Sequence, residues 1–579
     1  MKKTFLLSCL MLAAMPVMAA YTGHVYVDKN KNGVFDQSEK PLAGIKVSDG
    51  LNVVETAADG SFTLPGHERE RFIFITTPSG YKTFNRHYHK IEKKQSGYDF
   101  GLIPYSGRIR KNGSHRYIHI ADTEIFNTEN HADWVNNVRD YARNEQAAFI
   151  IHTGDICYEK GLKAHIKLMN TENMDCPVFY CIGNHDLVKG KYGEELFESI
   201  YGPVYYSFDA GNVHYVVTPM PGGDHAPGYT SDDVCRWLKN DLAHIRPGTP
   251  VVVFNHDLLT YEDTFIFKSK NAGSINLNEY NLKAWVYGHW HINYMKKQGD
   301  VYSVCTSSLD KGGIDHSTTA FRVMHVDSKG DFTSELRYTY LDKNICIASP
   351  AGVMASGVLP VAVNVYSSVS PVREVLYTCL ADGKPVLKNK RLLQSTDWSW
   401  NGELPLSHKY VGKELTLRVT ARFNNGEIAE AESNFICRTE KAVPLFSADW
   451  DNLSGNAKHS APVSAPLNLP LQLAWTNNVG ANLYMTSPLI HKGKVIVASV
   501  DEDLKGAGHV YALNGKDGTI LWSCPVRNSI KNSIAVDSDI VFAQDAQGFL
   551  YAIDTETGKL CWEKQLPVNG LPALIDGLV

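Results

Sequence analysis

Five apolar runs in the middle of the chain each end on a side chain that can bind a metal ion: "RYIHIAD", "AAFIIHTGD", "PVFYCIGNHD", "PVVVFNHD" and "KAWVYGHWH". Such runs indicate strands that are buried on both faces. Ligands of an α/β sheet bind beyond the carboxyl ends of its strands. One Asp, Asn or His after a strand is usually a turn residue or a helix cap, but turns alone do not explain five in succession. The series therefore predicts a metal site and a fold that gathers these strand ends.

Two helical patterns lie between these runs. They cover residues 132–144 and 231–245, and Ser231 is the predicted N-cap of the second helix. Buried strands that alternate with helices are typical of an α/β domain. We expect this domain to occupy residues 112–335.

The chemical character of the candidate ligands narrows the choice of metal. Imidazole, carboxylate and amide oxygen without thiolate suit iron, manganese or zinc. About seven candidates are too many for one ion, but they suit two ions about 3.5–4 Å apart that share a bridging carboxylate. Such pairs serve phosphate-ester hydrolysis, because they hold the phosphoryl oxygens and lower the pKa of a bridging water to give hydroxide.

The same segments resemble a known family. In order, "ADTE", "GDICY", "GNHD", "VFNH" and "GHWH" resemble the motifs of the calcineurin-like metallophosphoesterase superfamily over residues 112–335. The resemblance implies that Asp155 bridges two metals. It also implies that the first metal is bound by Asp122 and His291, and the second by Asn184, His256 and His289.

Two further residues of the "GNHD" motif receive roles from this resemblance. His185 would be the acid or charge stabiliser for the leaving group, outside the metals' own ligand sets. Asp186 either orients His185 or only caps the loop. Both are therefore candidate catalytic residues.

The first motif departs from the family pattern. Most members have Asp-x-His, whereas this chain has Asp122-Thr123-Glu124, which leaves the first metal one ligand short. Gly-Asp-x-x-Tyr is the pattern of the purple acid phosphatases, whose tyrosinate binds ferric iron, and Tyr158 fits it. Hard ions prefer oxygen donors, so we favour Tyr158 as the extra ligand. The alternative is that Glu124 coordinates and Tyr158 packs nearby.

All-β segments flank the central domain. Residues 21–106 alternate short apolar stretches with Gly, Pro and Asn and predict a small antiparallel β-sandwich. Residues 345–440 are again all-β, and residues 447–470 have the composition of a linker. These β domains resemble the accessory domains of a secreted bacterial branch of the superfamily.

The segment 471–579 repeats itself. "VYALNGKDGTILW" and "LYAIDTETGKLCW" match at a spacing of 40 residues, which is a period typical of propeller blades. The units resemble the blades of pyrroloquinoline-quinone-type β-propellers, and we expect a partial propeller. Its motif residues are structural: Gly518 and Gly558 in turns, Trp522 and Trp562 in packing.

The N-terminal β domain contains a possible calcium loop. "DKNKNGVFDQSE" matches the spacing of an EF-hand loop, although a strand-like segment precedes it where an EF-hand has a helix. The alternative is a polar hairpin turn. The candidate calcium ligands are Asp28, Asn30, Asn32, Asp36 and Glu39.

Residues 1–20 predict a secretory signal peptide, because two lysines precede a short apolar stretch and small residues. A periplasmic or otherwise secreted protein without membrane insertion follows. The net charge of −5 argues against nucleic acid as a structural partner. The sequence does not identify a partner for the propeller repeats.

Together these observations predict a multidomain protein with an α/β metallophosphoesterase core, all-β accessory domains and a partial β-propeller. We expect the core to be a β-sandwich flanked by helices. The predicted function is a secreted two-metal hydrolase of phosphomonoesters or phosphodiesters, with a phosphate ester as its substrate. The alternative, which the Glu124 departure supports, is a non-catalytic surface or scaffold protein with a degenerate core.

Overall fold

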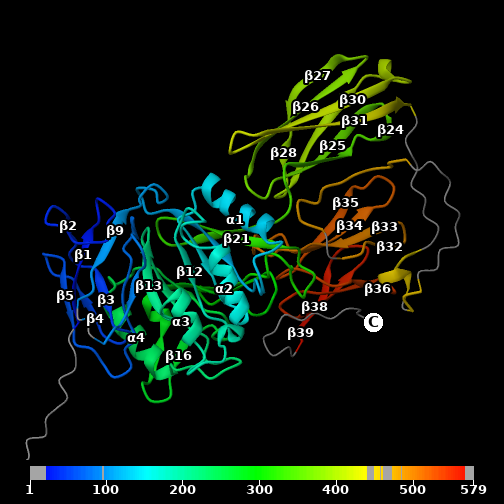
Figure 1. The fold of residues 1–579 in the computed structure, drawn as a ribbon. Helices are drawn as coiled ribbons and strands as arrows, with labels where there is room; N and C mark the ends of the chain where they lie inside the picture. The colour runs from blue at the N-terminus through cyan, green and yellow to red at the C-terminus, as the bar shows by residue number, and fades with distance from the viewer. Residues whose placement is uncertain are drawn as a thin grey trace, which may run out of the picture.

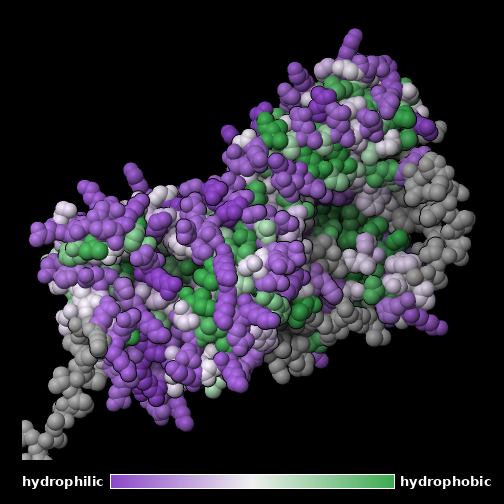
Figure 2. All heavy atoms as spheres, in the orientation of Figure 1, coloured by the Kyte–Doolittle hydropathy of each residue, from purple (hydrophilic) through white to green (hydrophobic). Residues whose placement is uncertain are grey.

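The computed structural model describes residues 21–93, 95, 97–439, 449–456, 458–460, 472–483 and 486–566. The predicted signal peptide, much of the predicted linker and residues 567–579 lie outside the described residues. No helix within these ranges is both long and apolar enough to cross a bilayer. Hydrophilic side chains predominate on the face shown in Figure 2.

The N-terminal domain consists of two small sheets that enclose one core. One sheet has the order β2-β1-β9-β7 with β5 also on β1, and the other has the order β4-β3-β6-β8. The predicted sandwich is not wholly antiparallel, because β1 and β9 pair in parallel. These strands begin and end the domain, and the intervening strands form the long connection that a parallel pair needs. The strands are β1 (Tyr21–Val27), β2 (Lys40–Pro41), β3 (Lys46–Ser48), β4 (Val53–Glu55), β5 (Ser61–Leu64), β6 (Phe72–Ile75), β7 (Tyr81–Thr83), β8 (Tyr88–Lys90) and β9 (Phe100–Pro104).

The central domain packs two sheets face to face. Their strand orders are β12-β11-β10-β21-β22 and β13-β14-β15-β18-β20-β19. The elements are β10 (His115–Ile120), α1 (Ala132–Asn144), β11 (Phe149–His152), α2 (Tyr158–Leu168), β12 (Val178–Tyr180), α3 (Glu195–Tyr201), β13 (Tyr206–Ala210), β14 (Val213–Val217), α4 (Ser231–Ala243), β15 (Val251–Phe254), β16 (Ile266–Lys268), β17 (Ser274–Asn276), β18 (Leu282–Tyr287), β19 (Tyr294–Gln298), β20 (Val301–Cys305), β21 (Ala320–Val326) and β22 (Phe332–Tyr338).

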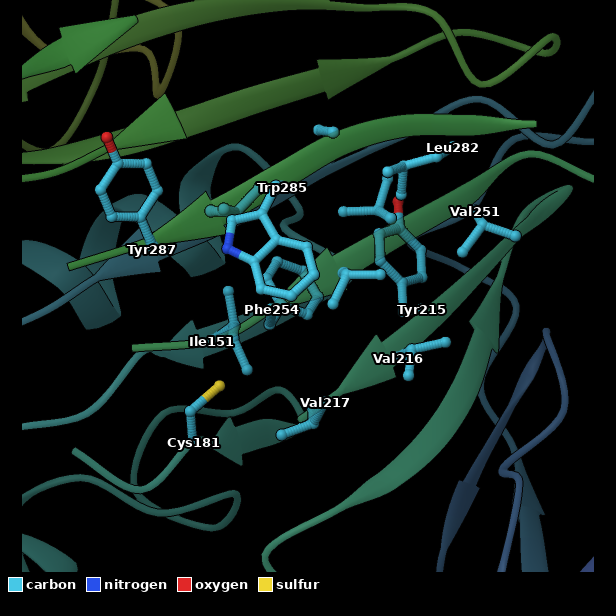
Figure 3. Close-up of a cluster of buried hydrophobic side chains, with 14 of the residues drawn as sticks. Ile151, Cys181, Tyr215, Val216, Val217, Val251, Phe254, Leu282, Trp285 and Tyr287 are labelled. Atoms are coloured by element: carbon cyan, nitrogen blue, oxygen red, sulfur yellow. The ribbon is translucent and has the colours of Figure 1, made fainter. Parts of the chain in front are cut away.

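Apolar side chains from both sheets meet in the layer between them (Figure 3). Phe149 of the first sheet, for example, packs edge to face on Tyr215 of the second, with ring centroids 5.0 Å apart. Alternate residues such as Ile118 and Ile150 point to the other face, where they pack against Trp134 of α1. Burial on both faces explains the nearly continuous apolar runs. The predicted sandwich flanked by helices is confirmed.

The second predicted helix begins as expected, but its cap lies one residue earlier. Helix α4 starts at Ser231, and Thr230 is the N-cap. The Thr230 side chain accepts a hydrogen bond from the Asp233 N–H, and the Asp233 carboxylate accepts one from the Thr230 N–H. This reciprocal pair is a capping box, which Ser231 as a helical residue cannot form.

A second sandwich follows the central domain and stands apart from the N-terminal domain in Figure 1. Its sheets have the orders β23-β25-β29-β28 and β24-β31-β30-β26-β27. Its strands are β23 (Asn344–Ser349), β24 (Gly352–Ala355), β25 (Gly357–Tyr366), β26 (Val372–Ala381), β27 (Lys384–Arg391), β28 (Leu393–Gln394), β29 (Ser399–Leu406), β30 (Glu414–Phe423) and β31 (Ile428–Arg438).

The repeats form two four-stranded antiparallel sheets, β32–β35 and β36–β39. Trp522 packs against the turn of the next unit, where its ring would lie 2.6 Å from a Cβ at Gly558. Trp562 differs from the predicted packing role, because it is 46% exposed and faces Phe542. The strands are β32 (Leu489–His491), β33 (Lys494–Ala498), β34 (His509–Asn514), β35 (Ile520–Pro525), β36 (Ala535–Asp537), β37 (Ile540–Gln544), β38 (Phe549–Asp554) and β39 (Leu560–Gln565).

A buried ionic network joins the repeats to the central domain. Lys531 Nζ, between the two repeat sheets, lies 2.6 Å from Asp315 Oδ2 of the central domain and 2.8 Å from Glu502 Oε1. It also donates to the Asn293 carbonyl at 2.6 Å. Nearby, Arg322 of β21 pairs with Asp503 at 2.6 Å. The repeats are therefore attached to the segment after His289 and His291, the predicted metal ligands that follow β18.

Candidate metal centre

The predicted ligands meet where the two central sheets end. Strands β10, β11 and β12 are parallel, and so are β14, β15, β18 and β20, so their carboxyl ends lie at common edges. The loops of the first sheet supply oxygen donors, and the loops of the second supply imidazoles. The oxygen donors are Asp122, Asp155 and Asn184, and the imidazoles are His256, His289 and His291.

Among the predicted ligands, two groups of side chains have ligand atoms within 4.8 Å of one another: Asp122, Asp155 and His291 form one, and Asp155, His256 and His289 the other. Asp155 belongs to both. Asn184 lies beside the second group, because its Oδ1 is 3.1 Å from His256 Nε2. The structure thus brings all six predicted oxygen and imidazole donors together, with the carboxylate predicted to bridge at their common point.

Two glycines allow this close approach. A Cβ at Gly183 would lie 2.2 Å from Asp155 Oδ1, and a Cβ at Gly288 would lie 2.6 Å from Asp122 Oδ2. Both distances are shorter than any van der Waals contact. The Gly that precedes the ligands in "GNHD" and "GHWH" therefore makes room for the carboxylate of the opposite loop.

The backbone at the site is held in an uncommon conformation. Asp122, Asp155, His289 and His291 have φ values of +52°, +56°, +65° and +52°. Left-handed φ at a residue other than glycine costs about 1–3 kcal/mol, and such residues cluster at active sites. Contacts compensate here: the His289 N–H donates to the Asp122 carboxylate at 3.1 Å.

The electrostatics of the cluster favour a bound cation. Burial raises the pKa of Asp122 well above its ordinary value, and the charge of Asp155 adds to this effect. Burial also lowers the pKa of His289 and His291, which keeps these imidazoles neutral, as metal ligands must be. Burial disfavours charge on His256, but Asp155 at 3.1 Å outweighs it and raises the pKa of His256 to about 10. The donor set of carboxylates, amide oxygen and imidazoles fits metal ions.

His185 has a partner that the sequence analysis did not single out. Its Nδ1 lies 2.9 Å from Asp224 Oδ2, and although partial burial opposes it, this hydrogen bond raises the pKa of His185. Asp224 lies in the loop after β14, the strand of a further apolar run, "VHYVVTP". Asp224 stands well beyond the end of that strand, so no local pattern in the sequence marks it.

Asp186 has a different role from orienting His185. It is fully buried, and its carboxylate accepts hydrogen bonds from the N–H groups of Asp155, Cys157 and Gly183. It therefore holds the loop that carries Asp155. Of the two roles considered for Asp186, these contacts support the loop cap, and the carboxylate that contacts the His185 ring is that of Asp224.

The two candidates for the extra ligand differ in their contacts. Glu124 Oε1 lies 3.5 Å from His291 Nε2, and Glu124 Oε2 accepts from Lys311 Nζ at 2.8 Å. Tyr158 is 40% exposed, and its ring lies 5.5 Å from the ring of His185. Glu124 thus contacts a member of the first ligand group, and Tyr158 contacts the candidate acid.

The predicted calcium loop lies between β1 and β2. The Asp28 carboxylate accepts from the N–H groups of Asn32 and Gly33, and the Glu39 carboxylate accepts from those of Lys29 and Asp36. The side-chain amides of Asn30 and Asn32 donate to Asp36. The five candidate ligands therefore share one folded loop.

Comparison with known proteins agrees with this geometry. Residues 29–104 match the family described as the N-terminal domain of calcineurin-like phosphoesterase, and residues 115–293 match calcineurin-like phosphoesterase itself. The match to the second family covers most of the central domain. Residues 472–574 match the family described as outer membrane protein assembly factor BamB, which agrees with the repeats of this chain.

A curated relative of this chain is purple acid phosphatase 13 of Arabidopsis thaliana. It is 26% identical over 215 residues, covering 35% of this chain. The chain spans 36% of that relative's length.

Among solved structures, a europium-containing methanol dehydrogenase is 23% identical over 20% of this chain and 23% of its own, with a TM-score of 0.17. A predicted phosphoesterase from Streptococcus pneumoniae is 10% identical over 39% of this chain and 98% of its own, with a TM-score of 0.19.

Proposed function

We propose that the protein is a two-metal phosphoesterase that hydrolyses a phosphomonoester or a phosphodiester. The observation that carries this proposal is the pair of ligand groups that share Asp155. A shared carboxylate between two donor sets is the arrangement of two-metal hydrolytic sites. The phosphoesterase family and the purple acid phosphatase relative support the same reaction class.

The residues of the chain have distinct tasks in this proposal. Asp122 and His291 would hold one ion, Asn184, His256 and His289 the other, and Asp155 both. Two ions there would polarise the phosphoryl group and acidify a bridging water to hydroxide; iron, manganese and zinc suit these donors. His256 presents Nε2 to the site because its Nδ1–H donates to the Thr153 carbonyl at 2.7 Å, which fixes the tautomer.

His185 is the proposed general acid. Its hydrogen bond to Asp224 favours the protonated imidazole, and it is half-buried beside the loop of Asp155. It would give its proton to the leaving oxygen as the ester bond breaks. Asp224 orients the ring for this step.

The extra ligand of the first metal has two candidates with different signatures. The contact between Glu124 and His291 supports Glu124, and the Gly-Asp-x-x-Tyr motif supports Tyr158. A tyrosinate on ferric iron gives visible absorption. Tyr158→Phe removes that colour if Tyr158 is the ligand, and Glu124→Gln lowers metal content if Glu124 is.

The test is metal analysis of the purified protein with assays of an aryl phosphate monoester and the matching diester. We expect close to two equivalents of metal and turnover of at least one ester. The alternative, a non-catalytic scaffold protein, predicts little metal and no turnover. Metal near two equivalents without turnover of any phosphate ester would also contradict the proposal.

We further propose that the protein is secreted, in the periplasm of a bacterial cell, because of the leader-like residues 1–20. The negative net charge supports a small phosphate ester rather than nucleic acid as the partner. The repeats would form part of a β-propeller. Cell fractionation with an antibody against the protein tests the location.

A further inference from the structure

Exposed apolar side chains of the phosphoesterase domain are concentrated around the metal centre. Residues 112–335 are all described, and their exposed large hydrophobic side chains are Phe126, Tyr158, Tyr261 and Ile314, with exposures of 57%, 40%, 47% and 69%. Phe126, Tyr261 and Ile314 lie in loops that carry or contact a predicted ligand, and Tyr158 is the first residue of α2, directly after the loop of Asp155. Exposed apolar groups that cluster at one place usually mark a binding site.

We call these exposed side chains, together with the Trp290 ring, the apolar rim. One part of this rim lies beside His185. The rings of Phe126 and Tyr158 stack, with centroids 6.3 Å apart and planes inclined by 18°. Tyr158 in turn lies 5.5 Å from the His185 ring. The stacked pair therefore adjoins the group proposed to protonate the leaving oxygen, where the organic part of an ester departs.

A second stacked pair lies on the histidine side. The rings of Tyr261 and Trp290 are 6.1 Å apart and inclined by 26°. Trp290 lies between the ligands His289 and His291 in the chain, and its indole N–H donates to Asp257, the residue after His256, at 3.1 Å. This anchor fixes the indole, on which the Tyr261 ring stacks.

Ile314 completes the rim near the first ligand group. The N–H of Ile314 donates to the His291 carbonyl at 2.9 Å. Its side chain is left 69% exposed. The positive charge nearby, Lys311 Nζ, is paired with Glu124 at 2.8 Å, so it is already balanced.

We propose that this rim binds the organic group of the substrate, and that this group is a planar aromatic or heteroaromatic ring system; the inference rests on the proposed phosphoesterase function. Flat aromatic pairs offer stacking surfaces, whereas a sugar or polyphosphate calls for hydrogen-bond donors and unpaired cations. In the reaction, the P–O bond to the organic group breaks and a P–O bond to the water oxygen forms. The departing alcohol oxygen receives a proton from His185, the proposed acid.

The test compares 2-naphthylmethyl phosphate with cyclohexylmethyl phosphate, together with the methyl diesters of both. Both leaving groups are alkanols of similar acidity, so the ratio of kcat/KM reports on ring binding and not on chemical reactivity. We expect a preference of about tenfold or more for the naphthyl ester, the ratio that one good aromatic stack provides. Phe126→Leu and Tyr261→Leu should each reduce this ratio several-fold. Trp562→Leu, which changes a half-exposed aromatic on the repeats, is the matched control and should leave the ratio unchanged.

A ratio near one in the unmodified protein, a preference for the cyclohexyl ester, or equal losses for both esters in the two loop variants would overturn the inference. Inhibition by the two corresponding phosphonates gives a second measurement that does not need turnover, and the naphthyl compound should bind more tightly. If the protein cleaves neither ester and holds no metal, the proposed function itself fails. If it cleaves both equally, only the aromatic preference fails.

Discussion

The candidate metal centre and the contact between the repeats and the central domain are both buried clusters of charge, but they are balanced differently. At the contact, burial opposes the charge of Lys531, yet Glu502 and Asp315 outweigh it and raise its pKa. At the candidate metal centre, burial raises the pKa of Asp122 well above its ordinary value. Burial also opposes the charge of Asp155, but His256 outweighs it and lowers the pKa of Asp155, so the chain supplies a close cationic partner for one of the two carboxylates.

The difference shows how a buried charge can serve structure or function. A buried ion pair that the chain completes by itself has a fixed geometry and needs nothing from solution. A buried group of carboxylates and neutral imidazoles is completed only by a cation from outside. The first kind attaches a domain, and the second kind creates a binding site.

The largest effect is expected at Asp155. Asp155→Asn removes the charge shared by both ligand groups and should lower kcat by more than about 10³-fold. This exceeds the decrease in kcat that follows removal of a single hydrogen-bond donor to a transition state. Metal content should fall as well, which metal analysis of the same sample checks. Asp331→Asn, at an exposed carboxylate paired with Lys283, is the control. Turnover that survives in Asp155→Asn would exclude a bridging role.

Lys531→Met should weaken the attachment of the repeats. Removing the cation leaves Asp315 and Glu502 buried without it, and breaking a buried pair costs about 3–5 kcal/mol. The measurement is the thermal unfolding of the full chain. Arg527→Met is the matched control, because Arg527 pairs with Glu563 on the surface and such pairs contribute at most about 1 kcal/mol. Equal effects of the two changes would contradict the comparison.

A third cluster sharpens the comparison through its pH dependence. Arg71 faces two carboxylates, Glu194 at 2.7 Å and Glu198 at 2.9 Å. Burial and the charge of Glu194, opposed by Arg71, raise the pKa of Glu198 from 4.5 to about 7. Because the pKa is raised in the folded state, the contribution of Glu198 to stability is fully present below pH 4.5 and is lost as the pH rises through 7. One pKa unit is about 1.4 kcal/mol, so ionisation of Glu198 should lower the free energy of unfolding by about 3 kcal/mol above pH 7. Glu198→Gln cannot ionise and should not show this decrease.

Glu335 gives the opposite sign and serves as the control for that experiment. Although burial opposes it, the adjacent Arg337 lowers the pKa of Glu335 to about 2. Its contribution is present above pH 4.5 and is lost as the pH falls through 2. Denaturant unfolding from pH 3 to 8 compares Glu198→Gln and Glu335→Gln with the unmodified protein. Identical pH profiles for the two variants would contradict the opposite pKa shifts of Glu198 and Glu335.

The smallest effect is expected at the calcium loop. Calcium at a hundred times its Kd should raise the free energy of unfolding of the N-terminal domain by about 2.7 kcal/mol. Asp28→Asn should abolish this rise, since Asp28 is almost fully buried in the loop. The melting temperature of the full chain with and without calcium is the measurement. No shift in the unmodified protein means that the loop is a polar turn.

Local pattern was sufficient to predict much of this protein. The helix over Ala132–Asn144 has the predicted bounds, and the apolar runs are strands because both of their faces are buried. The cap at Thr230 was missed because Ser231 has an equally suitable side chain, and only the backbone angles distinguish them. The exposed position of Trp562 was missed because the matching Trp522 is buried against Gly558.

The site was predictable where spacing along the chain carried the information. Asp224 was not, because it lies 39 residues from His185 and a loop acid has no pattern of its own. The contacts of Glu124 with His291 and Lys311 likewise depend on how the two sheets meet.

By itself, the sequence determined which donors follow which strands, since strand burial and the order of the motifs are local properties. Only the tertiary structure decided that carboxylates from one sheet face imidazoles from the other, and that Lys531 completes the buried cluster at the repeats. Those outcomes depend on distances between residues far apart in the chain, and electrostatic energies change steeply with such distances once water is excluded.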